Sequence, residues 1–354
     1  MEETSLTWDD RRWLITFCIV LALGLIGFAA KEAFMRIEPI PKEPGMEIYF
    51  FDVGQADCTL IRLDGHTMLI DAGNKGDANS NLKTTDNINL VYELKQLGVE
   101  KIDVFVNTHP HEDHMGGSAT IVENFEIGKI IAPNNEYDNI TTKFYTEFEE
   151  IVDAKNIKWF YPTTMTDEEI VDYEAKRRKY CEEHASEGYT YVAQEYIQIG
   201  DSFNFGEAVV TILSPNADSY KEKNNYSIAL KIEYEGSSIL FTGDIEAEAE
   251  KEIISMANKN GISLDVDILK SAHHGSETSS SQEFIDVVKP EFVVISCGWD
   301  NTYGHPDDII LERYMDNRTR IFRTDMLGDI IVYMNDGEIT FDTWSYLHTR
   351  KEKP

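Results

Sequence analysis

The chain has 354 residues, of which 42% are hydrophobic, enough to bury the core of one large domain or two small ones. Its formal net charge of −32, with no compensating basic tract, repels polyanions at long range and disfavours a scaffold that holds nucleic acid by phosphate contacts. The cysteines, Cys18, Cys58, Cys181 and Cys297, have no paired spacing, which argues against a disulfide framework and a cysteine-type zinc site.

The first predicted element is an apolar N-terminal segment. Residues Trp13 to Ala30 carry no charge, and such a run reaches the roughly 18 residues that a membrane-spanning helix needs. Arg11 and Arg12 precede it, so the positive-inside rule favours a cytoplasmic N-terminus. We therefore expect residues 1–36 to form a cytoplasmic tip and a single-pass anchor in the cell membrane, with an extracellular domain behind them. The small residues of GFAAKEA leave a cleaved signal peptide, and hence a secreted protein, as the alternative.

A proline-rich linker, residues 37–45, is predicted next, because the prolines of RIEPIPKEPG favour a stiff extended chain. Beyond it, MEIYFFDVG, CTLIRLDG and HTMLIDAGN are predicted strands that end at turn residues. DNINLVYELKQLG is a predicted helix with Asp86 or Asn87 as its cap and Gly98 as its stop. KIDVFVNTH is a predicted buried strand, and it leads into the histidine-rich segment THPHEDHMGG.

A second strand-rich region is predicted in the C-terminal half. It contains AVVTILSP, SIALKIEYEG, SSILFTGD, a helix over Glu246–Lys259, DVDILKSAHHGS, a helix from Ser281, EFVVISCG and a hairpin around MNDGEI. Two β-rich halves with interspersed helices predict a layered α/β sandwich. Between the halves, residues 136–199 are charged and helix-prone, so we expect solvated helix faces there. A cap over an active site is the alternative.

The segment THPHEDHMGG concentrates potential metal ligands. Imidazole and carboxylate groups bind catalytic zinc-type ions in sites that keep one position open for water. Adjacent side chains diverge, so four ligands within six residues can hardly converge on one ion. They can act as pairs, with His109 and His111 on one metal and Asp113 and His114 on a second. The two glycines that follow allow the next helix to begin close to this site.

This segment resembles the His-x-His-x-Asp-His signature of the metallo-β-lactamase superfamily, and the resemblance extends from about Met46 to about Trp344. It implies a four-layered αββα sandwich, which we expect as a hydrolase domain over residues 46–347. LIDAGN is similar to the family's first motif, which implies that Asp71 orients the histidine-rich turn and is not a ligand. ILFTGD places Asp244 where the family has a carboxylate that bridges two metals.

Two further histidine motifs complete the resemblance. LKSAHHGS places His273 and His274 together, and we expect His274 to bind the second metal while His273 contacts a phosphoryl oxygen of the substrate. YGHP places His305 either beside the substrate or in an ordinary turn. The resemblance implies two divalent ions as cofactors, zinc with manganese as the alternative. The candidate metal ligands are His109, His111, Asp113, His114, Asp244 and His274, and the candidate catalytic residues are Asp113, His273 and His305.

The finer resemblance is to the hydrolase-like domain of ComEC-type competence membrane proteins, through FDVGQADCTLI, NNYSIALKIEYEGSSILFTGD, LKSAHHGS, GHP and FRTDMLGDIIV. Phosphorylcholine esterases of the cell surface use a similar motif set. The histidine of the superfamily's third motif is missing here. Asn224 or Asn225 stands in its place, and we expect Asn225 to support the site from behind the ligands. The first metal then has only His109, His111 and Asp244 from the protein, which lowers its expected affinity.

Together these features predict a membrane-anchored, extracytoplasmic phosphoesterase or phosphodiesterase that uses a metal-bound hydroxide, since two metals can lower the pKa of a bridging water toward ~7. We expect its substrate to be a cell-envelope component or a nucleotide. A ComEC-like nuclease acting on single-stranded DNA is the first alternative, and the absence of an evident basic groove counts against it. A metal-binding module without catalysis is the second, because of the missing histidine.

Overall fold

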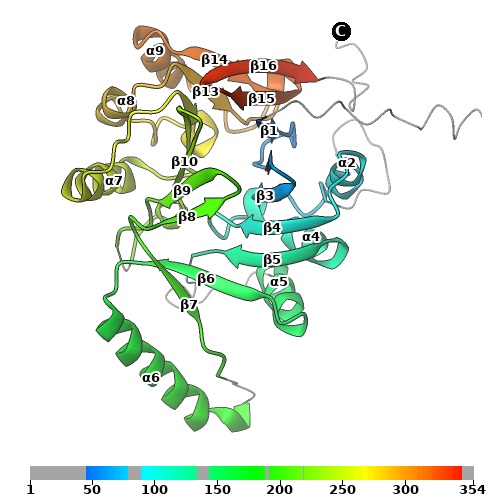
Figure 1. Cartoon of the computed structure of the whole chain (residues 1–354), viewed down its shortest axis with the longest axis vertical. Coiled ribbons are helices and arrows are strands. Elements are labelled where there is room, and N and C mark those ends of the chain that lie inside the picture. Colours follow the sequence, from blue (N-terminus) through cyan, green and yellow to red (C-terminus); the bar gives the residue numbers. More distant parts are fainter. Residues whose placement is uncertain (1–44, 79–88, 134–142, 188–190, 218, 345–354) are drawn as a thin grey trace, which may run out of the picture. The chain divides into compact units, whose positions relative to one another are not determined.

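Two β-sheets form the framework of the protein (Figure 1). The computed structural model describes residues 45–78, 89–133, 143–187, 191–217 and 219–344. Within these residues one sheet has nine strands in the order β16-β15-β1-β2-β3-β4-β5-β6-β7, and the other has seven in the order β14-β13-β12-β11-β10-β9-β8. The strands of the first sheet are β1 (Met46–Phe50), β2 (Thr59–Leu63), β3 (His66–Ile70), β4 (Lys101–Val106), β5 (Glu126–Ile131), β6 (Lys158–Thr163), β7 (Glu195–Gln198), β15 (Asp329–Asn335) and β16 (Glu338–Trp344). Those of the second sheet are β8 (Ser202–Phe205), β9 (Ala208–Ile212), β10 (Leu230–Tyr234), β11 (Ser237–Phe241), β12 (Ile268–Lys270), β13 (Phe292–Ile295) and β14 (Arg320–Arg323).

The sheets share one apolar core because successive residues of a strand point to opposite faces. In β11, Ile239 and Phe241 belong to a buried cluster that also contains Ile48 and Phe50 of β1 in the other sheet. Leu240, between them, belongs to a separate cluster on the outer face of its sheet. Strands that are covered on both faces are apolar at nearly every position, which explains the continuous apolar runs of the sequence.

Helices pack on the outer face of each sheet. On the first sheet, Phe148 of α5 (Lys143–Ala154) packs edge-on against Phe105 of β4 with ring centroids 6.2 Å apart. On the second sheet, Ile253 of α7 (Ala247–Asn260) lies in the same buried cluster as Leu240. The predicted α/β sandwich with two sheets is therefore confirmed. The remaining helices are α2 (Leu90–Gln96), α3 (Glu112–Met115), α4 (Ser118–Asn124), α6 (Asp167–Glu183), α8 (Gln282–Val288), α9 (Asp308–Asp316) and α10 (Thr324–Leu327), and the 3-10 turns are η2 (Ala185–Glu187), η3 (Lys223–Tyr226) and η4 (Ala272–Gly275).

Most of the predicted elements are present, with small shifts at their ends. The helix predicted over Glu246–Lys259 is α7, which has Glu246 at its N-cap and Gly261, at φ +69°, at its C-cap. The helix predicted from Ser281 is α8, and the Ser281 side chain accepts a hydrogen bond from the amide of Phe284. The predicted C-terminal hairpin is β15 and β16.

The charged segment 136–199 contributes strands that the sequence analysis did not predict. β6 pairs in parallel with β5, and β7 pairs in parallel with β6, so the two strands extend the first sheet to its edge. The helix α6 between them has no buried residue and begins with a capping box between Thr166 and Glu169, as expected for a solvated helix. Figure 1 shows α6 extending away from the sheets. A cap over the active site stays an interpretation from the sequence.

The predicted anchor cannot be followed in the structure. Residues 13–30, like most of the linker 37–45, lie outside the described residues. Among the described residues, no helix is both long and apolar enough to cross a membrane.

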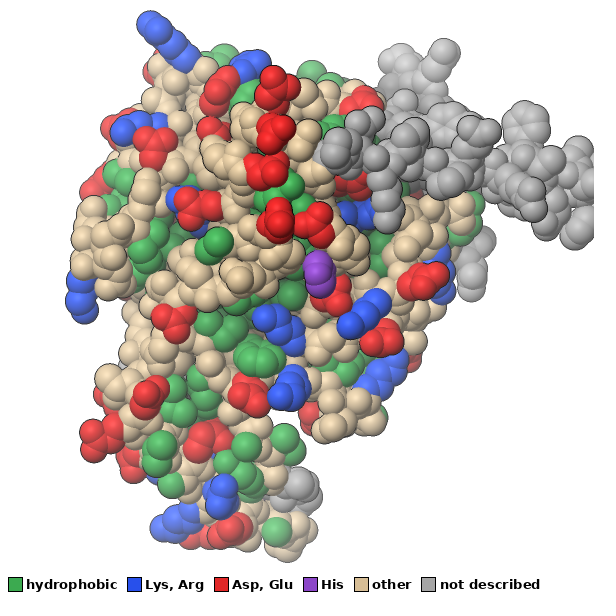
Figure 2. Space-filling model, in the orientation of Figure 1, with side chains coloured by type: hydrophobic (Ala, Val, Ile, Leu, Met, Phe, Trp, Pro, Cys, Tyr) green, Lys and Arg blue, Asp and Glu red, His purple; other side chains and the backbone are tan. Residues whose placement is uncertain are grey.

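On the face shown in Figure 2, acidic side chains gather in the upper half, over the β15–β16 hairpin, whereas several Lys and Arg side chains lie lower on the same face.

Candidate metal centre

Strand ends bring the candidate residues together at one edge of the sandwich. His109 follows β4, Asp244 follows β11 and His274 follows β12, and each of these strands has a parallel neighbour. Ligand sites of α/β sheets lie beyond the carboxyl ends of such strands. The two sheets are joined here by a backbone hydrogen bond of 2.9 Å from the N–H of Ile228 to the carbonyl of Thr108.

The glycines after the histidine-rich turn permit a close backbone approach. A Cβ atom on Gly117 would collide with the carbonyl oxygen of Ala72, and one on Gly116 would collide with the backbone nitrogen of Lys75. The N–H of Ala72 also donates to the carbonyl of His114 at 2.7 Å. The prediction that these glycines let the next helix, α4, begin beside the site is confirmed.

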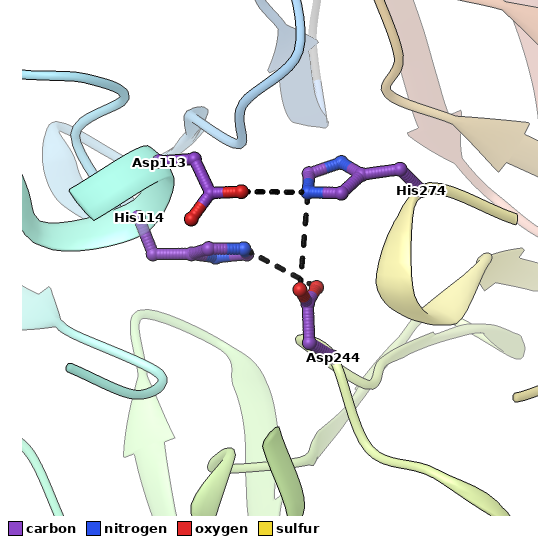
Figure 3. Close-up of side chains that lie close together, drawn as sticks. All are labelled: Asp113, His114, Asp244 and His274. Carbon is purple, nitrogen blue, oxygen red and sulfur yellow. Dashed lines mark hydrogen bonds and ion pairs between the residues drawn. The ribbon is translucent and has the colours of Figure 1, made fainter. Parts of the chain in front are cut away.

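Four side chains converge in a buried group (Figure 3). Nε2 of His114 lies 3.2 Å from Oδ1 of Asp244. Nε2 of His274 lies 3.3 Å from Oδ2 of Asp113 and 3.8 Å from Oδ2 of Asp244. One nitrogen or oxygen of each of the four residues lies within 4.8 Å of all the others. Asp113 and His114 come from α3, and the other two come from the ends of β11 and β12.

This group fits a divalent cation. Nε2 of His114 and Oδ1 of Asp244 are buried, and neither takes part in a hydrogen bond although they are only 3.2 Å apart. Buried polar atoms without a partner are costly and therefore uncommon in proteins. Two imidazole nitrogens with carboxylate oxygens are a donor set that zinc-type ions accept. The His/Asp group can therefore bind metal.

His109 and His111 lie beside the four-residue group, with the ring centroid of His109 4.2 Å from that of His114. Nε2 of His109 is 3.0 Å from Nδ1 of His111 and 3.8 Å from Oδ2 of Asp244. Asp244 is thus close to His109 as well as to His114 and His274, as a carboxylate that bridges two ions would need to be. A first ion held by His109, His111 and Asp244 stays a prediction.

Asp71 supports the site from the side of His114 that faces away from Asp244. It follows β3 with a left-handed φ of +59°. Its Oδ1 accepts the N–H of Thr108 and its Oδ2 accepts the hydroxyl of Thr108, both at 2.7 Å. Oδ2 also lies 2.7 Å from Nδ1 of His114. A carboxylate on the outer nitrogen of a histidine fixes its tautomer and the direction of its free nitrogen.

The buried charged groups shift one another's pKa values. Burial favours a neutral imidazole, but the carboxylates of Asp244 and Asp71 outweigh it and raise the pKa of His114 well above its ordinary value. Burial alone would raise the pKa of Asp244, but His114 and His274 hold it well below its usual range. Burial lowers the pKa of His109, and the charge of His114 adds to this effect. A divalent ion at Nε2 of His114 needs that nitrogen unprotonated, so protonation of His114 and metal binding compete.

His273 and His274 point in different directions because of the turn that holds them. Within η4 both have left-handed backbones, with φ +50° and +53°, a region that residues other than glycine rarely occupy. His274 is 2% exposed, and its Nδ1 lies 2.9 Å from the carbonyl of Ser296. The side chain of His273 is 23% exposed, with Nε2 3.9 Å from Oδ2 of Asp244. This placement suits His274 as the ligand and His273 as the substrate contact, and both roles stay predictions.

Asn224, not Asn225, lies next to His273. Nδ2 of Asn224 is 3.4 Å from both ring nitrogens of His273 and donates to Oε1 of Glu246 at 3.1 Å. Asn225 accepts the N–H of Glu246 at 2.8 Å and so fixes the start of α7. Both asparagines belong to the 3-10 turn η3, where consecutive side chains point about a third of a turn apart. The different contacts of these two side chains could not be inferred from their adjacent positions in the sequence.

The sequence analysis missed a buried ion pair behind His274. Nζ of Lys270 lies 2.8 Å from Oδ2 of Asp57, and their side chains are 3% and 7% exposed. Oδ1 of Asp57 lies 3.8 Å from Nδ1 of His274. Both residues belong to the motifs FDVGQADCTLI and LKSAHHGS. The available signal was a lysine at the end of a buried strand, a position that lysine occupies only with a partner.

Comparisons with known proteins show the family of the chain. Residues 51–299 match the metallo-β-lactamase superfamily. ComE operon protein 3 of Bacillus subtilis is 27% identical over 241 residues, which cover 68% of this chain and 26% of the relative. Competence protein ComA of Neisseria gonorrhoeae is 25% identical over 312 residues, which cover 88% of this chain and 34% of the relative. The chain therefore spans only about a quarter to a third of the length of these relatives. The metallo-β-lactamase fold protein YhfI of Bacillus subtilis aligns with 79% of this chain and 96% of its own, at 10% identity and a TM-score of 0.40.

Proposed function

The chain belongs to the metallo-β-lactamase superfamily and has its metal-dependent hydrolase fold, and we propose that it hydrolyses a phosphoester or phosphodiester. The observation that carries this proposal is the buried group of Asp113, His114, Asp244 and His274, which converges on unpaired nitrogen and oxygen atoms. His273 lies at the more exposed side of this group, where a substrate can reach it.

The residues have distinct parts in this reaction. Asp113, His114, Asp244 and His274 would hold one divalent ion, and His109 and His111 would hold a second together with Asp244. A bound divalent ion of this kind lowers the pKa of a water ligand toward neutrality and polarises a phosphoryl oxygen. Asp71 fixes the ring of His114 by its contact with Nδ1.

Two side chains can handle the substrate and the proton. Nε2 of His273 is close to Asp244 and partly exposed, so it can donate a hydrogen bond to a phosphoryl oxygen. The Asp113 side chain is 31% exposed and contacts His274 through Oδ2. A carboxylate held at one oxygen can accept the proton of an attacking water at the other.

We propose further that the hydrolase domain over residues 46–347 lies outside the cell, joined by the linker 37–45 to a single membrane anchor. The uncharged run 13–30 after Arg11 and Arg12 supports this arrangement. The substrate would then be a phosphoester of the cell envelope or a nucleotide that reaches the surface.

Elemental analysis and phosphodiesterase assays of the purified full chain test the proposal. We expect more than one zinc or manganese ion per chain and metal-dependent hydrolysis of bis-p-nitrophenyl phosphate. Asp244→Asn should lose both, while Asp172→Asn, on the solvated helix α6, should lose neither. A folded protein that binds no metal at saturating supply would contradict the proposal. Faster digestion of single-stranded DNA than of any small phosphodiester would replace it with the nuclease alternative.

A further inference from the structure

A row of rings leads from the protein surface to Asp244. The rings of Tyr303 and His305 stack with their centroids 5.7 Å apart, and His305 meets His273 edge-on at 5.6 Å. Nε2 of His273 lies 3.9 Å from Oδ2 of Asp244. Exposure falls from 71% at Tyr303 to 2% at Asp244. Nδ1 of His305 is buried and has no hydrogen-bond partner, so the middle of the row keeps an unused polar atom.

The loop that carries Tyr303 and His305 is fixed by its own hydrogen bonds. It runs from the end of β13 to α9. The side-chain amide of Asn301 donates to the carbonyls of Gly298 and His305 at 2.9 and 2.6 Å. Its Oδ1 accepts the N–H groups of Tyr303 and His305, both at 3.1 Å. Tyr303 is therefore exposed on a backbone that is tied down on both sides.

Two large aromatic side chains of this loop face solvent. Trp299 is 58% exposed and Tyr303 is 71% exposed. In the part of the chain that the structure describes, the other exposed aromatic side chains are Tyr92 on α2 and Tyr180 on α6, far from the loop in sequence. Exposed aromatic groups forgo the stabilisation that burial would provide. Their occurrence together beside a hydrolytic site indicates that a ligand covers them.

The charges around this loop limit the ligand to few phosphates. Asp300 and Glu277 are exposed, and the half-buried Asp307 accepts the N–H of Glu277 at 2.7 Å. A strand with many phosphates would be repelled by these carboxylates, whereas a single phosphoester can lie at His273 and His305. The part of the ligand that reaches the loop is therefore apolar and uncharged.

We infer that Tyr303 and Trp299 form a subsite for a flat ring on the alcohol of the phosphoester, as in a nucleotide or an aryl ester. Flat rings stack on tyrosine and tryptophan with little dependence on their substituents. This inference rests on the proposed function, because that function places the phosphoryl group at His273. The row of rings connects that position with the subsite.

Calorimetric titration of the metal-loaded full chain tests the subsite directly. The probes are AMP, phenyl phosphate and ribose 5-phosphate, of which the last has no aromatic ring. We expect AMP to bind roughly 5- to 100-fold more tightly than ribose 5-phosphate, the range that one stacked ring provides. Tyr303→Ala should remove most of this difference, and Tyr303→Phe should retain it. Tyr180→Ala is the control for loss of an exposed tyrosine elsewhere. Tight binding of phenyl phosphate as well would show that any aryl ring suffices, and AMP alone would indicate a nucleobase.

Several results would overturn the inference. AMP and ribose 5-phosphate could bind equally well, or Tyr303→Ala could weaken both to the same degree. If phosphocholine lost as much affinity as AMP in Tyr303→Ala, the loop would bind cations through its aromatic faces and not flat rings. Turnover of phosphodiesters without any preference for a ring refutes the subsite alone. Ring-dependent binding without turnover supports the subsite and refutes the proposed function.

Discussion

Replacing Lys270 by methionine should strongly destabilise the protein, because it leaves a carboxylate buried without its cation. Nζ of Lys270 lies 2.8 Å from Oδ2 of Asp57, and both side chains are more than nine-tenths buried. Methionine occupies a similar volume, so little packing is lost. The other oxygen of Asp57 has no hydrogen bond, so no second donor takes over the charge.

The expected cost is about 3–5 kcal/mol, the usual effect of removing one partner of a buried ion pair. A natural protein has roughly 5–15 kcal/mol of stability in total, so this single change removes a large share. Asp57→Asn should cost a similar amount, since it leaves Lys270 buried without its anion. The double variant contains neither charge and should be about as stable as the unchanged protein, because exchanging a whole buried pair for neutral side chains is often neutral.

Urea unfolding of the full chain, followed by tryptophan fluorescence, measures these free energies. The matched control is Lys231→Met. The Lys231 side chain is also buried, at 4% exposure, and its Nζ lies 2.8 Å from Oε1 of Glu233, but the Glu233 side chain is 51% exposed. Removing Lys231 leaves a carboxylate that water can solvate, so the cost should be small. If Lys270→Met costs no more than this control, or if the effects of the two single changes simply add in the double variant, the reasoning is wrong.

Other predictions concern the metal, the pH dependence and the anchor. Asp71→Asn should lower zinc affinity roughly 10- to 100-fold because His114 loses the carboxylate on its outer nitrogen; unchanged affinity in a zinc titration would count against that role. His274→Ala should empty a metal position, whereas His273→Ala should lower turnover with metal content near normal; the opposite pattern in elemental analysis would reverse the two roles. Burial raises the pKa of Asp77 from 3.8 to about 6, so between these values the folded chain keeps a proton that the unfolded chain has lost, and stability falls as pH rises through the window. The free energy of unfolding of Asp77→Asn, relative to that of the unchanged protein, should therefore rise by up to roughly 3 kcal/mol as the pH goes from about 4 to about 8. Urea unfolding at several pH values measures this difference, and a difference that does not vary with pH would contradict the prediction. Protease added to intact cells should degrade the domain if residues 13–30 anchor it outside; protection would show the opposite orientation, and release into the medium a cleaved signal.

The sequence determined those features that depend on neighbours along the chain. Alternating and continuous apolar runs identified strands such as β11, because side-chain direction in a strand has a period of two residues. The helix predicted over Glu246–Lys259 agrees with α7 almost to the residue. The His-x-His-x-Asp-His turn identified the kind of chemistry, since its residue types and spacing are local properties.

Only the tertiary structure decided which side chains meet. The strands β6 and β7 were not predicted, because their short runs within a charged segment become strands only by pairing, β6 with β5 and β7 with β6. Asp57 and Lys270 are 213 positions apart and form a pair only because the ends of two sheets meet. The left-handed turn at His273 and His274 sends one ring to the buried group and the other toward His305 and Tyr303. Such contacts depend on strand order and backbone direction over the whole fold, and no local pattern of residues records them.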